Sequence, residues 1–496
     1  MRARRIPVSV ALALLLVSVT VAAGCGQQRA VIAPSPTPRP TAGLHDWAGV
    51  VCGSAHTLAL QKDGSLWAWG GNDAGQLGLG DTTERHAPTK GGSASDWASV
   101  ACGYERTSAL QNDGSLWAWG LNYHGDLGVG GANDRLTPTQ VGSASEWAAV
   151  ACGYNYTLAV KRDGSLWAWG SNDAGQLGLG GTSERHTPTR VDSASDWAAV
   201  ACGYQHSLGL KNDGSLWAWG HNGAGELGLG DIDDRHSPTR VGGANDWAGV
   251  SCDLTVTLAL QKDGSLWAWG SNDAGQLGLG DTSARHAPHR VGGARDWASV
   301  NCGYQSSLAV KSDGSLWAWG YNGGGQLGLG DTRNRHTPTR VRGAGDWAAV
   351  ACDFTAALGL RKDGTLWSWG GNGFGQLGLG DTRDRLTPTR VGRASNWAAV
   401  ACGYDFALAV KKHGSLWAWG HNYVGQLGLG DTTTRLTPTR VGTATNWASV
   451  SCGDGDSLAV KTNGTLWAWG FNGNGELGLG DTEERQTPTE VGSGSP

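Results

Sequence analysis

Charged residues are scarce in this chain, and methionine is almost missing from it. Only 16% of the 496 residues are charged, the formal net charge is −5, and the single methionine is Met1. Nucleic-acid binding requires a basic face, and nothing in this composition supplies one. Gly, with 82 residues, and Trp, with 27, are in large excess instead. Such a biased composition indicates one small unit copied many times.

The N-terminus carries the pattern of a secretory signal. Three arginines (Arg2, Arg4 and Arg5) precede an apolar run over Val8–Ala23, and small residues follow it. The run is too short for a membrane span, so we interpret residues 1–24 as a signal peptide. The tetrapeptide Ala22-Ala23-Gly24-Cys25 resembles the bacterial lipobox, whose cysteine is acylated. The alternative is a plain cleaved signal followed by an unrelated cysteine.

Residues 25–43 form a spacer in this interpretation. Pro34, Pro36, Pro38 and Pro40 recur there among Ser and Thr, which is typical of a stiff, extended linker. Loss of the three signal-peptide arginines takes the formal net charge from −5 to −8. We therefore expect an exported lipoprotein of the cell envelope that touches the membrane only through lipid on Cys25.

A repeat of 50 residues fills the chain from Leu44 onward. Three tryptophan positions, first seen at Trp47, Trp67 and Trp69, recur in all nine repeats and account for all 27 tryptophans. Strand-like runs over 47–52, 57–60 and 65–69, and a weaker one near Pro88, are apolar on both faces. Sheets covered on both sides are typical of propeller blades. We predict an all-β, circular β-propeller of nine four-stranded blades over 44–496; a seven-bladed ring with two extra repeats is the alternative.

A tight turn joins the second and third strands of each repeat. Gly64 is Gly in every repeat, and the residue before it is Asp in seven, with His413 and Asn463 in the others. These residue types tolerate the positive φ of a two-residue hairpin. The position therefore predicts an Asp-Gly turn.

Other uniform positions are interpreted as structural. The glycine-rich loop around Asn72 lacks the Lys-Ser/Thr of a phosphate-binding loop, so we expect no cofactor there. Arg85 never varies although Asp81 does, which favours bonds from Arg85 to loop carbonyls. One cysteine per repeat, from Cys52 to Cys452, is expected to be a small buried side chain, with neither a disulfide nor a metal.

The repeat also resembles a known family. The pattern Val-x-Cys-Gly-x-x-x-[Thr/Ser]-Leu-Ala-[Leu/Val]-x-x-Asp-Gly-Ser-Leu-Trp-Ala-Trp-Gly-x-Asn-x-x-Gly-Gln-Leu-Gly-Leu-Gly-Asp is similar to the regulator-of-chromosome-condensation repeat in all nine copies. The resemblance implies a circular propeller, usually of seven blades, that acts mainly as a protein-binding platform. It also implies guanine-nucleotide exchange on a small GTPase as an alternative function. We identify the chain as a bacterial exported member.

The repeats differ mainly in six positions, equivalent to residues 54–56 and to 71, 73 and 74 of the first repeat. All nine tyrosines and all four phenylalanines fall there. In a four-stranded meander these positions share one end of the blades, and exposed aromatic rings are typical of protein-binding surfaces. The predicted partner-binding residues are Glu105, Arg106, Tyr123, His124, Tyr156, His206, His221, Tyr321, Phe374, Asp405, Phe406, His421, Tyr423 and Phe471.

Two alternatives to a partner surface remain open. In the first alternative, the rings at position 54, which is Tyr or Phe in six repeats, pack within the blade, and the loops of copied repeats drift without function. Asp405, Asp454 and Asp456 are the best candidates for hydrolysis or for holding a cation. No spacing of a nucleophile and a base is visible, so we expect no enzyme, no catalytic residue and no metal. We expect a monomer that binds a protein, with a carbohydrate as the alternative ligand.

Overall fold

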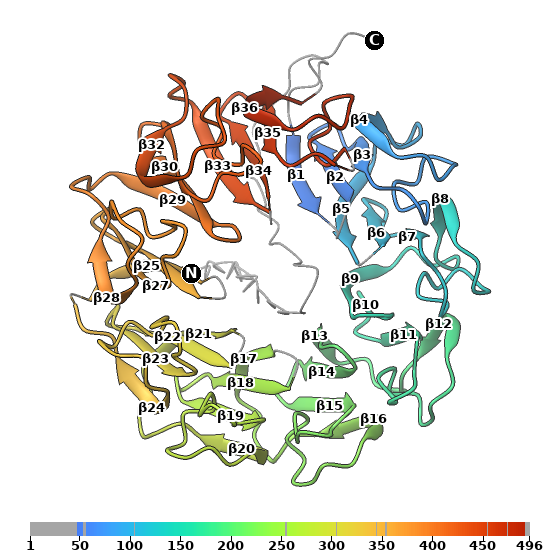
Figure 1. Ribbon diagram of the computed structural model, residues 1–496. Coiled ribbons are helices and arrows are strands. Elements are labelled where there is room, and N and C mark those ends of the chain that lie inside the picture. The colour runs from blue at the N-terminus through green and yellow to red at the C-terminus, as the bar shows by residue number, and fades with distance from the viewer. Residues whose placement is uncertain are drawn as a thin grey trace, which may run out of the picture.

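The computed structural model describes residues 47–52, 56–103, 105–252, 255–303, 305–343, 345–352, 355–453, 455–473 and 475–491. Over these ranges the regular structure is all strand, and no helix there has the length and hydrophobicity to span a membrane. Each repeat forms one antiparallel sheet of four strands in chain order. The nine sheets surround a common axis (Figure 1). The predicted all-β propeller of nine four-stranded blades is confirmed.

The first strand of each blade lies nearest the axis and the fourth at the outer rim (Figure 1). The first strands are β1 (Trp47–Cys52), β5 (Trp97–Cys102), β9 (Trp147–Cys152), β13 (Trp197–Cys202), β17 (Trp247–Cys252), β21 (Trp297–Gly303), β25 (Trp347–Cys352), β29 (Trp397–Cys402) and β33 (Trp447–Cys452). The second strands are β2 (His56–Gln61), β6 (Arg106–Gln111), β10 (Tyr156–Lys161), β14 (His206–Lys211), β18 (Val256–Gln261), β22 (Ser306–Lys311), β26 (Ala356–Arg361), β30 (Phe406–Lys411) and β34 (Asp456–Lys461).

The outer half of each blade is equally regular. The third strands are β3 (Leu66–Gly70), β7 (Leu116–Gly120), β11 (Leu166–Gly170), β15 (Leu216–Gly220), β19 (Leu266–Gly270), β23 (Leu316–Gly320), β27 (Leu366–Gly370), β31 (Leu416–Gly420) and β35 (Leu466–Gly470). The fourth strands are β4 (Arg85–Lys90), β8 (Arg135–Gln140), β12 (Arg185–Arg190), β16 (Arg235–Arg240), β20 (Arg285–Arg290), β24 (Arg335–Arg340), β28 (Arg385–Arg390), β32 (Arg435–Arg440) and β36 (Arg485–Glu490).

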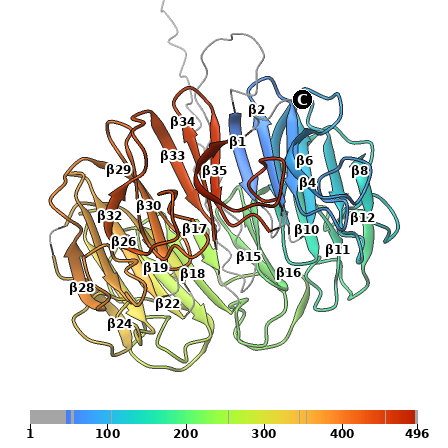
Figure 2. The ribbon, with the colours of Figure 1, turned by 45° about the horizontal axis from the view of Figure 1, so that its top comes forward.

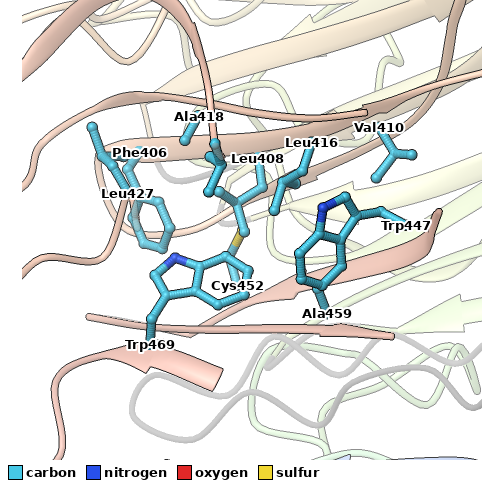
Figure 3. Packing of buried hydrophobic residues seen from close by; sticks show 11 residues of the cluster. Phe406, Leu408, Val410, Leu416, Ala418, Leu427, Trp447, Cys452, Ala459 and Trp469 are labelled. Carbon is cyan, nitrogen blue, oxygen red and sulfur yellow. The ribbon is translucent and has the colours of Figure 1, made fainter. Parts of the chain in front are cut away.

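The hydrophobic core lies between the blades. Successive strand residues point to opposite faces, so Phe406, Leu408 and Val410 of β30 share one face. They pack against Trp447 and Trp469 of the ninth blade (Figure 3). The opposite face of the second strand packs on the preceding blade. Because both faces of the second and third strands are covered, these strands are apolar on both faces, as the sequence predicted, whereas the fourth strands are polar and only partly buried.

The third-strand tryptophans also join neighbouring blades. Trp119 Nε1 donates a hydrogen bond to the Gln76 carbonyl oxygen of the preceding blade at 2.9 Å. The ring lies so close to Gly78 that a Cβ there would come within 2.7 Å of the indole nitrogen. Glycine is required at this position because the ring of the next blade fills the space of a side chain.

The same contacts close the ring between the ninth and first blades. Trp69 Nε1 donates to the Glu476 carbonyl at 2.9 Å. The Trp47 amide donates to the Gly464 carbonyl at 3.4 Å. Trp47 and Trp69 share a buried cluster with Leu466 of the last blade. All nine repeats belong to one ring, so the alternative of a seven-bladed ring with two extra repeats is wrong.

The predicted Asp-Gly turn is present, but only its glycine has a positive φ; Asp63 does not, and the loop spans the three residues 62–64. Gly64 has a φ of +81°. The Asp63 carboxylate accepts a hydrogen bond from the Ser65 amide at 2.9 Å. In the glycine-rich loop, the Asn72 side chain accepts from the Leu77 amide at 2.9 Å and donates to the Asp81 carbonyl at 2.9 Å. These bonds give the loop a structural role.

Arg85 bonds a loop carbonyl as predicted, and it has a second partner. Its Nη1 donates to the Thr83 carbonyl at 2.6 Å, and its Nη2 contacts the Asp81 carboxylate at 2.6 Å. Where Gly131 replaces the aspartate, Arg135 donates to the Gly130 carbonyl instead. The interpretation that the arginine bonds carbonyls alone was therefore incomplete.

The described cysteine side chains lie in or beside the core. Cys102, Cys202 and Cys452 are buried, while Cys152 and Cys402 are half-buried. The Cys202 thiol faces the Ala151 carbonyl of the preceding blade at 3.6 Å. Burial of the first three confirms their prediction as small core residues.

Candidate functional site

The variable positions meet at one end of the blades, which we call the loop face. In the third blade, Thr157 pairs with Cys152 and Tyr156 pairs with Gly170. The loop after the first strand and the loop after the third strand therefore emerge together. The Asp-Gly turns lie at the opposite end of the strands, the turn face. The side view of the ring shows the strands running between these two ends (Figure 2).

Exposed aromatic rings are concentrated on the loop face. Tyr123, Tyr423 and Tyr404 are 73%, 61% and 60% exposed. The other large exposed rings are Tyr154, Tyr204, Tyr321, Phe374 and Phe471. A rigid ring that is already exposed loses little entropy when it contacts a partner.

A stack of three rings crosses the seventh and eighth blades, and Phe471 of the ninth blade lies beyond its end. The Phe374 and His421 ring centroids are 4.5 Å apart at an interplanar angle of 29°. His421 and Tyr423 follow at 4.6 Å and 33°. A Cβ built on Gly455 would lie 3.9 Å from the Tyr423 hydroxyl and 3.3 Å from Phe471 Cβ, so these rings border one glycine. We call Phe374, Tyr404, His421, Tyr423 and Phe471 the aromatic arc.

The second to fourth blades hold a smaller group of rings. Tyr154 and Tyr204 lie 4.7 Å apart at 31°. Tyr123 meets His124 edge-on at 4.8 Å, and His124 Nδ1 lies 2.7 Å from the Glu184 carboxylate. His221 contacts the buried Glu226 carboxylate at 2.6 Å. These histidines are tied to acidic groups within the propeller.

Four predicted contact residues are buried and do not reach the surface. Tyr156 and Phe406 are 0% and 1% exposed, and Arg106 and His206 are also buried. All four occupy the first position of the second strand, whose side chain points to the next blade. Tyr156 donates to the His206 carbonyl at 2.6 Å, and Arg106 donates to the Gly153 carbonyl at 2.7 Å. We therefore correct the prediction, because these side chains connect blades.

The alternative that the rings at position 54 pack within the blade does not hold for the three that are described. Tyr154, Tyr204 and Tyr404 are exposed. The signal that separates the two positions is the strand boundary. Tyr156 begins β10 and shares its face with the buried Leu158 and Val160, whereas Tyr154 lies in the loop before that strand.

Among the described acidic candidates, Glu105 belongs to the second blade, Asp405 to the eighth and Asp456 to the ninth. Asp405 has a φ of +60° and accepts a hydrogen bond from Gln376 Nε2 at 2.9 Å. Burial, with Asp73 and Asp134 nearby, raises the pKa of Glu105. Asp456 is half-buried, and Asp454 lies outside the described residues, as do residues 1–46 with Cys25. Across the part of the chain that is described, no three His, Cys, Asp or Glu side chains form a metal-binding group.

Curated relatives match only a short segment of this chain. The ultraviolet-B receptor UVR8 of Arabidopsis thaliana is 46% identical over 41 residues, which are 8% of this chain and 9% of the receptor. The protein RCC2 homolog of Danio rerio is 54% identical over 41 residues, 8% of each chain. The chain thus matches less than a tenth of the length of these relatives.

Solved structures match over a longer stretch. Human WBSCR16 is 26% identical with a TM-score of 0.47, covering 68% of this chain and 96% of that one. Yeast RCC1 (Prp20), solved bound to Kap60, is 24% identical with a TM-score of 0.44, covering 66% and 83%. A family model described as the RCC1-like domain matches residues 22–357 and 245–495, which include the nine blades. The chain belongs to the RCC1-like domain family.

Proposed function

We propose that this propeller binds a protein partner through the aromatic arc on its loop face. The observation that carries the proposal is the stack of exposed rings from Phe374 through His421 to Tyr423, bordered by Phe471 and Tyr404. These rings stand on loops whose backbones are fixed by hydrogen bonds, as in the bond from the Phe374 amide to Gln376 at 3.0 Å. Preordered aromatic rings concentrate binding energy in few residues.

Other repeats supply tolerated substitutions for testing the arc. We choose Phe374→Ala, Tyr404→Ser and Tyr423→Gly, because Ala74, Ser54 and Gly223 hold the equivalent positions. The triple variant should lose at least about tenfold in partner capture, since several ring contacts of about 1 kcal/mol or more are removed. Capture is measured by chemical crosslinking of the immobilised propeller in a cell-envelope extract, followed by mass spectrometry.

Two controls separate binding from folding. Tyr154→Ser with Tyr204→Ser removes exposed rings from the third and fourth blades and should leave capture by the arc unchanged. Tyr156→Ala should lower the free energy of unfolding by about 3–5 kcal/mol, because it empties a space between blades. The triple variant should unfold at the temperature of the unmodified protein. Undiminished capture by the triple variant, or specific retention on immobilised glycans alone, would refute a protein-binding arc.

We further propose that the protein is exported and held at a membrane by lipid on Cys25. The support is the sequence alone: a basic segment, a short apolar run and the Ala-Ala-Gly-Cys motif. Cells fed radiolabelled palmitate should label the protein, whereas Cys25→Ser should abolish the label and release the protein from the membrane fraction. A membrane-bound, unlabelled protein would contradict acylation.

A further inference from the structure

Unpaired hydrogen-bond donors recur at the boundaries between blades. The tryptophan that starts each first strand is buried. In seven blades its Nε1 has no hydrogen-bond acceptor among the described residues, namely in Trp47, Trp97, Trp147, Trp247, Trp297, Trp397 and Trp447. A buried donor without an acceptor costs about 1–3 kcal/mol. Seven such donors in equivalent places require an explanation beyond chance.

The fourth blade shows which group satisfies this donor. There, Trp197 Nε1 donates to the Asp192 carboxylate at 3.3 Å. The same carboxylate oxygen accepts from the Ala194 amide at 3.0 Å. Position 192 is glycine in seven of the nine repeats, so most blades have no such carboxylate. One blade therefore carries, within its own chain, an acceptor that the equivalent indoles lack.

A cavity of about 370 Å³ lies at the equivalent place between the fifth and sixth blades. Arg290, Gly292, Trp297, Lys311 and Trp317 are among its lining residues. Gly292 is the counterpart of Asp192 and Trp297 that of Trp197. Both positions lie beside the indole that follows them, but their backbones differ, because Gly292 has a φ of +62° and Asp192 does not have a positive φ. The volume is that of a small-ligand pocket.

The charges around this cavity favour an anion. Lys311 Nζ lies 4.8 Å from the ring centroids of both Trp297 and Trp317 and pairs with Asp296 at 2.9 Å. Arg290 Nη2 donates to the Gly293 carbonyl at 3.0 Å. Its Nε is buried and, like Trp297 Nε1, has no acceptor among the described residues. Asp263 also interacts with Arg290 and pairs with Arg295 at 2.9 Å, so three cations stand against two carboxylates around the cavity, and two donors remain for a ligand.

We propose that the cavity between the fifth and sixth blades binds a carboxylate, which accepts hydrogen bonds from Trp297 Nε1 and Arg290 Nε beside the Lys311 ammonium. The carboxylate belongs to a small organic acid or to an acidic side chain, whose apolar part lies beside the two tryptophan rings, which meet edge to face at 5.8 Å. A bond between a charged acceptor and a buried donor is stronger than one between neutral groups. This site is independent of the aromatic arc.

Indole resonances in proton–nitrogen NMR spectra test the proposal directly. The full mature chain is titrated with sodium acetate, with sodium chloride at equal ionic strength as the control, and Trp297→Phe assigns the resonance. The Trp297 resonance should shift in a saturable way with acetate and not with chloride. The Trp197 resonance should not shift, because Trp197 Nε1 already donates its hydrogen bond to Asp192.

Three variants that use residues found in other repeats sharpen the test. Asp192→Gly should make Trp197 respond to acetate, and Gly292→Asp should abolish the response of Trp297. Asp296→Asn, which copies Asn396 and Asn446, removes an opposing charge and should tighten acetate binding by roughly threefold to tenfold.

A second titration distinguishes the two sources of the carboxylate. A glutamate-containing peptide with blocked ends should shift the Trp297 resonance if the site accepts side chains, whereas a response to acetate alone assigns it to free acids. Absence of any response in the unmodified chain and in Asp192→Gly would overturn the proposal, as would a Trp197 that moves with acetate while Asp192 is present.

Discussion

At the scale of single residues, position 56 of the repeat shows that sequence variation need not mean recognition. It holds His56, Arg106, Tyr156 and Phe406 in four blades, and all four are buried. Arg106 donates to the Gly153 and Tyr156 carbonyls, and the Tyr156 hydroxyl donates to the equivalent Gly203 and His206 carbonyls, so different side chains join the same backbone positions of the next blade. The sequence places every tyrosine and phenylalanine in the variable positions. It does not show that position 54 lies in a loop and position 56, two residues later, in a strand. The strand boundary decides which rings reach solvent.

Buried His56 makes stability depend on pH. Burial lowers its pKa to about 4 from an ordinary value of 6.5. The unfolded chain therefore takes up a proton before the folded one does. Stability should fall as the pH drops from about 6.5 towards 4, by about 3 kcal/mol, and the contribution should be constant outside that window.

His56→Val isolates this contribution, because Val256 holds the same position in the fifth blade. Urea unfolding is measured for both proteins from pH 7.5 to pH 4. The free energy of unfolding of the unmodified protein should fall relative to that of His56→Val as the pH is lowered. Parallel pH profiles of the two proteins would show that His56 is accessible to protons in the folded state.

At the scale of the elements, local chemistry made the blade predictable. The Asp-Gly turn, the apolar runs and the proline-containing outer strand each follow from neighbouring residues. The sequence did not show that the turn also supports the next blade. Trp97 donates its amide to the Gly64 carbonyl at 3.1 Å, so each turn accepts the start of the following first strand. That contact joins residues of different repeats, and no periodicity encodes it.

A methyl group at the turn should therefore disturb two blades. Gly264 has a φ of +76°, and a Cβ there would lie 2.8 Å from the Arg295 carbonyl carbon. Gly242 has a φ of +61° with nothing within 4 Å of its Cβ position. Gly242→Ala should cost about 1–2 kcal/mol through its backbone alone. Gly264→Ala should lower the free energy of unfolding clearly more than Gly242→Ala does, as measured by urea unfolding. Equal losses would mean that the turn backbone relaxes around the methyl group without further cost.

At the scale of the whole molecule, the ring is held by the contacts between its last and first blades. The number of repeats is plain in the sequence, but closure depends on the angle between neighbouring sheets, which is a property of their packing. For this reason the sequence left open a seven-bladed ring. The aromatic arc has the same origin. Its residues come from three blades, and only the geometry of the propeller brings Phe374 of the seventh blade against His421 of the eighth.

Closure can be tested by opening the ring in two ways. Deletion of residues 447–491 exposes the buried face of Trp47 and Trp69, and loss of a single buried tryptophan already costs about 3–5 kcal/mol. We expect this shortened chain to aggregate or to unfold at a much lower temperature. Size-exclusion chromatography and thermal unfolding measure both effects.

A circular permutant provides the matched control. It begins at Gly293, ends at Gly292 and joins residue 491 to Trp47 by five residues, the length of the connection over 92–96. Because it keeps all nine interfaces, it should unfold near the temperature of the original chain. A stable, monomeric deletion variant would show that closure is dispensable.

Each four-stranded sheet is made from a single repeat, with no strand borrowed from another copy. Unequal recombination between two copies in the gene would therefore add or remove a whole blade and leave every remaining sheet intact. Such an event would change the circumference of the propeller by one blade at a time. It would also shift the spacing of the aromatic side chains on the loop face. The gene thus has a direct route to new partner specificities that requires no new fold.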